Sequence, residues 1–153
     1  DVHIMVDNPW LFQKVFIEAG ADMITFHYEA VKDNEDCFNL INEIKNKDKK
    51  VGISIKPKTD INVLMPFLKS IDLVLIMSVE PGFGGQSFIE ESLDKIKKLK
   101  EIIVSNNYDT LIEVDGGIND ETGLLCKKAG ADGLVAGSYI FNGDIVSAVD
   151  SIK

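Results

Sequence analysis

Glycines and a carboxylate follow three apolar runs of this chain, in a pattern suited to holding an anion. The segment Glu80–Gln86 reads EPGFGGQ, Asp115–Gly117 reads DGG, and Gly137–Ser138 follows a third run. Glycine allows tight turns whose backbone N–H groups approach a ligand, as in phosphate-binding loops. A flexible connector is the alternative for the first segment, and an Asx-type turn or helix cap is the alternative for Asp115. We expect the Asp115 carboxylate to be open to a ligand because the two residues after it lack side chains.

A second pattern consists of groups that suit a metal ion. His3 provides an imidazole and Asp115 a carboxylate, and such groups bind zinc, iron, manganese or cobalt. Two ligands are too few for a tight site. Met5 and Met77 either pack against a planar intermediate or fill the core, which is the default role of methionine.

The pattern of apolar and polar residues predicts the strands and helices that position these residues. Short apolar runs alternate with segments of helical period, which predicts βα units and a parallel sheet. Asn8 and Pro9 signal a helix start, and Gly20 and Gly130 signal helix ends. The predicted strands are Val2–Val6, Met23–Tyr28, Val51–Lys56, Leu73–Val79, Leu111–Asp115 and Gly133–Gly137. The predicted helices are Pro9–Ala19, Asp36–Lys45, Ile61–Leu68, Ser87–Asn106, Asp120–Ala129 and Ile145–Ile152.

Parity separates a packing face from a polar face in four of these strands, because alternate strand residues point to opposite sides. His3, His27, Lys56 and Glu113 fall on the polar faces. Such faces indicate a (β/α)8 barrel or an open doubly wound sheet. An ion network in which Lys56 neutralises Glu29 or Glu113 is the structural alternative. His27 is either a hydrogen-bonded core histidine or a direct ligand.

Length and composition narrow the class of protein. The 153 residues form one predicted domain, with no apolar stretch long enough for a membrane helix and no signal peptide, so we expect a soluble, cytoplasmic protein. Cys37 and Cys126 are expected to be buried free thiols. The net charge of −9 opposes nucleic-acid binding. A core strand begins almost at residue 1, which predicts that the N-terminal part of the fold is missing.

These motifs together resemble the ribulose-phosphate 3-epimerase family. The resemblance runs in order along the whole chain, and its two strongest markers are VEPGFGGQ at 79–86 and DVHIMV at 1–6. It rests also on TFHYEA at 25–30, IKP at 55–57, IEVDGG at 112–117 and GS at 137–138.

The resemblance implies a (β/α)8 TIM barrel and a metal-dependent interconversion of D-ribulose 5-phosphate and D-xylulose 5-phosphate through a cis-enediolate, within the pentose phosphate pathway. Asp115 corresponds to a catalytic acid and metal ligand, and His3 to a second ligand of one divalent ion. The implied partner is a sugar phosphate, and a homo-oligomer is compatible with the family. The residues matched to substrate binding are His3, Met5, Met77, Gly82, Phe83, Gly84, Gly85, Gly116, Gly117, Gly137 and Ser138.

The chain also departs from the family pattern. The first two βα units are absent, so that strands 3 to 8 remain, and with those units go a His ligand and the Asp that serves as the other catalytic acid. We therefore expect the 153-residue chain to be inactive alone and its open sheet edges to associate. Alternatives are an epimerase of allulose 6-phosphate and a non-catalytic phosphate-binding barrel fragment. A sugar-phosphate decarboxylase is disfavoured because its D-x-K-x-x-D motif is absent.

Overall fold

The computed structural model describes residues 1–80, 82 and 85–153, in which strands alternate with helices. The strands are β1 (Val2–Ile4), β2 (Met23–His27), β3 (Lys50–Ile55), β4 (Leu73–Met77), β5 (Leu111–Asp115) and β6 (Gly133–Val135). The α-helices are α1 (Pro9–Glu18), α2 (Asn34–Lys45), α3 (Ser92–Ser105), α4 (Asp120–Ala129), α5 (Ser138–Phe141) and α6 (Ile145–Ile152). Short 3-10 turns are η1 (Tyr28–Ala30), η2 (Ile61–Leu64) and η3 (Leu68–Ser70).

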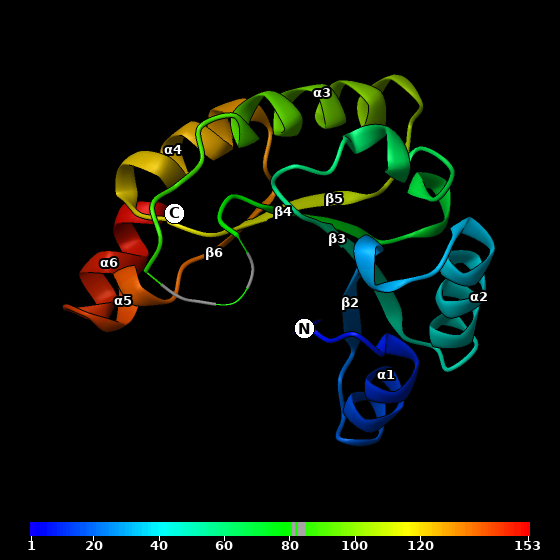
Figure 1. Cartoon of the computed structure of the whole chain (residues 1–153). Coiled ribbons are helices and arrows are strands. Elements are labelled where there is room, and N and C mark those ends of the chain that lie inside the picture. The colour runs from blue at the N-terminus through cyan, green and yellow to red at the C-terminus, as the bar shows by residue number, and fades with distance from the viewer. Residues whose placement is uncertain (81, 83–84) are drawn as a thin grey trace.

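The six strands form one parallel sheet in sequence order, β1-β2-β3-β4-β5-β6. The sheet curls into a half-barrel, and the helices lie along its outer side from α1 round to α6 (Figure 1). The carboxyl ends of all strands therefore meet at one rim, where barrels and open α/β sheets build their sites. Across the part of the chain that the structure describes, no helix is both long and apolar enough to cross a membrane.

Local signals at the helix ends are confirmed. The Asn8 side chain accepts a hydrogen bond from the Leu11 N–H at 3.2 Å, with Pro9 as the first helical residue. Gly130 has a φ of 112° and ends α4, and Gly20 has a φ of 104° just after α1. This left-handed backbone is open to glycine at no steric cost.

Two predicted helices are wrong in part. The segment predicted as the helix Ile61–Leu68 forms the separate turns η2 and η3, because Pro66 lacks the N–H that a continuous helix needs. The helix predicted from Ser87 begins only at Ser92. The Ile89 N–H instead donates to the Ser78 carbonyl at 2.8 Å, which holds the preceding segment against the end of β4.

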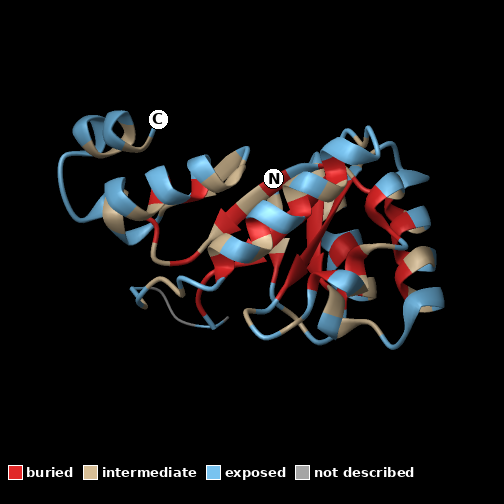
Figure 2. Ribbon diagram, turned by 90° about the horizontal axis from the view of Figure 1, so that it is seen from above, coloured by how far each residue is buried: buried red, intermediate tan, exposed pale blue. Residues whose placement is uncertain are grey.

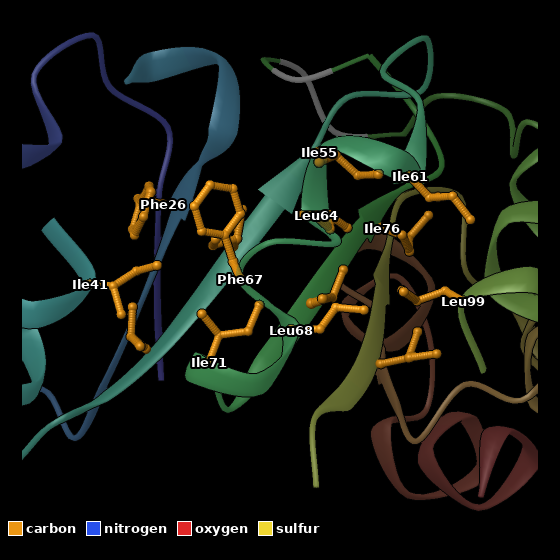
Figure 3. Packing of buried hydrophobic residues seen from close by; sticks show 14 of the residues in the cluster. Phe26, Ile41, Ile55, Ile61, Leu64, Phe67, Leu68, Ile71, Ile76 and Leu99 are labelled. Carbon is orange, nitrogen blue, oxygen red and sulfur yellow. The ribbon is translucent and has the colours of Figure 1, made fainter. Parts of the chain in front are cut away.

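The core lies between the sheet and the helices and confirms the parity argument. Ile24, Phe26 and Ile53 are fully buried on the outer face. Figure 3 shows Phe26 and Phe67 pointing into the same apolar layer. In Figure 2 the buried residues follow the strands and the helix faces turned toward them, whereas α5 and α6 contain no buried residue. On the inner face of β4 and just beyond it, a second cluster is formed by Leu73, Leu75, Met77 and Val79.

The two thiols are also where the sequence predicts them. Cys37 on α2 and Cys126 on α4 are both buried and free. Burial raises the pKa of Cys37 to about 12, with a further contribution from Asp36, and raises that of Cys126 to about 11. Both thiols are therefore inert packing groups in the folded chain.

Candidate active site

Two neighbouring cavities open at the carboxyl rim of the sheet. The first, about 290 Å³, is lined by Met5, Val6, Asp7, His27, Glu29, Ala30, Lys56 and Gly82. The second, about 250 Å³, is lined by Met5, Met77, Val79, Glu80, Gly82, Gly85, Gln86, Asp115, Gly116, Gly117, Ile118, Val135, Gly137 and Ser138. Met5 and Gly82 line both, so the two cavities lie side by side. Most residues that the sequence predicts for substrate binding line the second one.

The turn after β5 leaves Asp115 open to the second cavity. Gly116 has a φ of 126°, and a Cβ there would lie 2.5 Å from a Val79 methyl. Gly117 has a φ of 62°, and a Cβ there would lie 2.6 Å from the Phe88 nitrogen. Both positions therefore require glycine for conformation and for space. The Asp115 side chain is 25% exposed and lines this cavity.

Ser78 fixes this turn, a role that the sequence did not indicate. Its buried hydroxyl lies within hydrogen-bond distance of the Gly116 carbonyl at 2.7 Å and of the Asp115 carbonyl at 3.1 Å. The Ser78 N–H also donates to the Asp115 carbonyl at 2.9 Å. The end of β4 thus holds the end of β5 in place. A hydroxyl directly after five apolar strand residues was the only available signal.

His3 stands between the two cavities. Its Nδ1 lies 3.8 Å from Asp115 Oδ2, and its Nε2 lies 2.9 Å from the Nε2 of His27. Among the described residues it lines neither cavity itself, yet it contacts a residue of each. The register explains the second contact: His3 pairs with Thr25, so His27 is the next residue on the same face of β2.

His27 is held from behind by Glu29. The His27 Nδ1 lies 3.4 Å from Glu29 Oε2, and Glu29 Oε1 accepts from the Lys56 N–H at 2.8 Å and from the Thr59 hydroxyl. Burial by itself raises the pKa of Glu29, but these hydrogen bonds outweigh it and lower the pKa to about 2. The carboxylate is therefore ionised at neutral pH.

The structural alternative for Lys56, an ion network with Glu29 or Glu113, is not found among the described residues. The Lys56 side chain is exposed, and among the described residues no ion pair joins it to Glu29 or Glu113. Lys56 contributes its backbone N–H instead. Lys95 reinforces this loop by donating to the carbonyls of Pro57, at 2.5 Å, and Thr59. Long-range contacts of this kind leave no local pattern in the sequence.

Glu113 lies two residues before Asp115 on the same inner face of β5. Burial raises its pKa, the nearby Asp115 raises it further, and His3 partly offsets the increase. Glu113 thus adds a half-buried acid below the site.

The two methionines contribute apolar surface to the second cavity. Met77 is 1% exposed and pairs in register with Asp115, whereas Met5 follows β1 and is 48% exposed. The acid therefore lies beside an apolar side chain, with Met5 on the side shared by both cavities.

The glycine-rich loop after β4 is described only in part. Gly82 has a φ of 131° and Gly85 a φ of 74°, and both line the second cavity, whereas Phe83 and Gly84 lie outside the described residues. Gly137 and Ser138 line the same cavity. Residues of the glycine-rich turns thus border one cavity, and an anion site there stays a prediction.

His3 and Asp115 fit part of a divalent-metal site. Their facing atoms are 3.8 Å apart, within the roughly 4.2 Å that two ligands at about 2.1 Å from one ion can span. An imidazole with a carboxylate is also a suitable donor pair. Across the described ranges no group of three or more His, Cys, Asp or Glu residues is arranged to hold a metal ion.

Solved structures of similar shape share the fold of this chain. A 3-hexulose-6-phosphate synthase superposes with a TM-score of 0.68 at 20% identity, covering 93% of this chain and 65% of the other. A 3-keto-L-gulonate-6-phosphate decarboxylase from Vibrio cholerae gives a TM-score of 0.67 at 16% identity, covering 93% and 64%. At these identities the likeness concerns the fold alone.

Sequence relatives are closer. The chain is similar to proteins named ribulose-phosphate 3-epimerase from Methanocaldococcus jannaschii (48% identity, 100% of this chain), Chlamydia muridarum (38%, 99%) and Mycobacterium bovis (42%, 94%). It spans 64%, 66% and 62% of their respective lengths. The sequence model of the ribulose-phosphate 3 epimerase family matches residues 1–141, a range that contains every candidate site residue. The chain therefore belongs to the ribulose-phosphate 3-epimerase family.

Proposed function

We propose that the enzyme built on this chain interconverts D-ribulose 5-phosphate and D-xylulose 5-phosphate by moving a proton at C3. The observation that carries the proposal is one cavity that combines the Asp115 carboxylate, the apolar Met5 and Met77 side chains and three glycine turns. An acid beside an apolar wall suits an enediolate, and the turns suit a phosphate. The name of the family indicates that the substrate is ribulose phosphate.

Asp115 serves as the acid for one face of C3. A carboxyl group within reach of the carbon takes or returns a proton, and the cavity orients the substrate for that step. Inversion at one carbon needs a second acid on the opposite face. We place it on two further βα units that complete an eight-stranded, single-domain barrel, in which the six strands here are strands 3 to 8. The relatives' greater length supports this arrangement, as do the outer edges of β1 and β6, which pair with no further strand among the described residues.

His3 and Asp115 would hold one divalent ion, such as zinc, iron, manganese or cobalt, together with ligands from those additional units. When bound, the ion stabilises negative charge on the substrate oxygens as a Lewis acid. Met5 and Met77 keep water from the planar intermediate. The N–H groups of Gly85, the Gly116–Gly117 turn and Gly137–Ser138 bind the phosphate.

The partner in this proposal is therefore a small sugar phosphate. We place the enzyme in the cytoplasm, within the pentose phosphate pathway, and expect homo-oligomers of the complete barrel. The 153-residue chain alone is expected to show no turnover, because one of the two acids is absent from it.

A chimera tests the proposal. The segment of the M. jannaschii relative that supplies the first two βα units is fused in front of residue 1, and conversion of ribulose 5-phosphate and deuterium uptake at C3 are measured with metal added. We expect turnover by the chimera, none by the 153-residue chain, and none by the chimera carrying Asp115→Asn. A folded chimera that binds the substrate without exchange at C3 would indicate a phosphate-binding module instead. A higher kcat/KM on allulose 6-phosphate would reassign the substrate.

A further inference from the structure

The side chains of Glu29, His27 and His3 form a line that starts at η1 and ends at Asp115. Glu29 contacts His27 at 3.4 Å, His27 contacts His3 at 2.9 Å, and His3 Nδ1 faces Asp115 across 3.8 Å. Resting on the proposed function, we infer that Glu29 and His27 are positioning residues, which fix the tautomer of His3 so that its Nδ1 presents a lone pair toward Asp115. Neither residue touches the reacting atoms in this scheme.

Glu29 determines which atom donates each hydrogen bond along this line. Both of its oxygens are engaged: Oε1 accepts from the Lys56 N–H and the Thr59 hydroxyl, and Oε2 faces His27 Nδ1. An ionised carboxylate accepts hydrogen bonds and donates none. The hydrogen between the two side chains must therefore sit on His27 Nδ1.

The remaining hydrogens follow from imidazole chemistry. In the inferred arrangement His27 is neutral and carries one N–H, so a hydrogen on Nδ1 leaves its Nε2 as an acceptor. Since that atom lies 2.9 Å from the Nε2 of His3, His3 must donate from Nε2. The Nδ1 of His3 is then an unprotonated lone pair, as a metal ligand requires.

The two imidazole rings lie close together in a largely buried place. His27 is 5% exposed, and the two imidazole rings are tilted by 33° with centroids 4.9 Å apart. The hydrogen bond between the two rings could also run in the opposite direction. A doubly protonated His27 would then donate to His3 Nε2, and His3 would carry its hydrogen on Nδ1, facing Asp115. Observing the protonated nitrogen of one ring therefore distinguishes the two directions.

The first test is ¹⁵N NMR of the metal-free 153-residue chain with labelled histidines, near neutral pH. Only His3 and His27 are present in the sequence, so the spectrum contains two rings. We expect His27 to show the Nδ1–H form and His3 the Nε2–H form. An Nδ1–H form of His3, or a doubly protonated His27, would overturn the inference. This result does not depend on catalytic turnover, so it is distinguishable from failure of the proposed function.

The second test is Glu29→Gln, which keeps the size of the side chain. In this variant the Lys56 N–H donates to the carbonyl oxygen of the new Gln side chain. Its NH₂ group therefore points toward His27 Nδ1. Both rings should then switch: His27 to Nε2–H and His3 to Nδ1–H. Thr59→Val is the matched control, because it removes a hydrogen bond to Glu29 without altering the group that faces His27, and both rings should keep their wild-type forms.

Binding of Zn²⁺ alone, measured by calorimetry, gives an independent readout. Loss of such an outer partner typically lowers metal affinity by about 10- to 100-fold, and we expect a decrease in this range for Glu29→Gln. Equal Zn²⁺ affinities of wild type and variant, or no Zn²⁺ binding by wild type, would refute the inference that Glu29 and His27 prepare His3 to bind a cation. If the variant fails to fold, the NMR result for the wild type still decides the direction of the hydrogen bond between His27 and His3.

Discussion

Glu29 makes the stability of this chain depend on acid in a calculable way. Its pKa falls from 4.5 to about 2 on folding, and each pKa unit corresponds to about 1.4 kcal/mol. Ionised Glu29 therefore contributes up to about 3 kcal/mol at neutral pH. Because the folded pKa is the lower one, the contribution is complete above the unfolded value and is lost as pH falls from about 4.5 through about 2. Its side chain is 22% exposed, so solvent screening makes this an upper figure.

The assay is urea unfolding of wild type and Glu29→Gln at several pH values. Between about pH 6 and about pH 3, the wild type should lose up to about 2 kcal/mol that the variant does not lose, so the difference between them narrows by that amount. Glu18→Gln, at an exposed position of α1, is the matched control for loss of one surface carboxylate. A difference between wild type and Glu29→Gln that stays constant with pH would refute the reasoning.

Three further perturbations test the site and the core. Asp115→Asn in the chimera should lower kcat by several orders of magnitude while the protein stays folded by circular dichroism; near-normal turnover would remove Asp115 from the mechanism. Gly117→Ala should destabilise the chain by about 1 to 3 kcal/mol in urea, because φ is positive and the new Cβ meets the Phe88 backbone, and an unchanged midpoint would contradict that contact. Cys37 and Cys126 should react with a thiol reagent at mildly alkaline pH only after urea unfolding; rapid labelling of the folded chain would show that they are not buried.

Much of the site was predictable because its parts are local. The DGG turn after an apolar run placed Asp115 at the end of a strand, and alternation within strands placed His3 and Met77 on the inner face. The glycine requirement also came from local geometry, and the structure shows its cause at Gly116 and Gly117. The assignment of these residues to a reaction remains a proposal.

Other features of the site depend on distant partners. A Lys56 side chain that neutralises Glu29 or Glu113 was one of two alternatives, and it is the Lys56 backbone N–H that reaches Glu29. The helix expected from Ser87 starts later because the Ile89 N–H donates to Ser78. The role of Ser78 has no local signal, because a single serine after a strand can form many different hydrogen bonds.

The amino-acid sequence alone determined the alternation of strands and helices, the buried faces and the positions where the backbone must turn through glycine. These depend on hydropathy, periodicity and conformational preference, which operate within a few residues. Only the tertiary structure decided which polar groups meet. The β1–β2 register sets His3 beside His27, and β3 brings the Lys56 N–H to Glu29. Hydrogen bonds reach only about 3 Å, so strand pairing, rather than spacing along the chain, selects these partners.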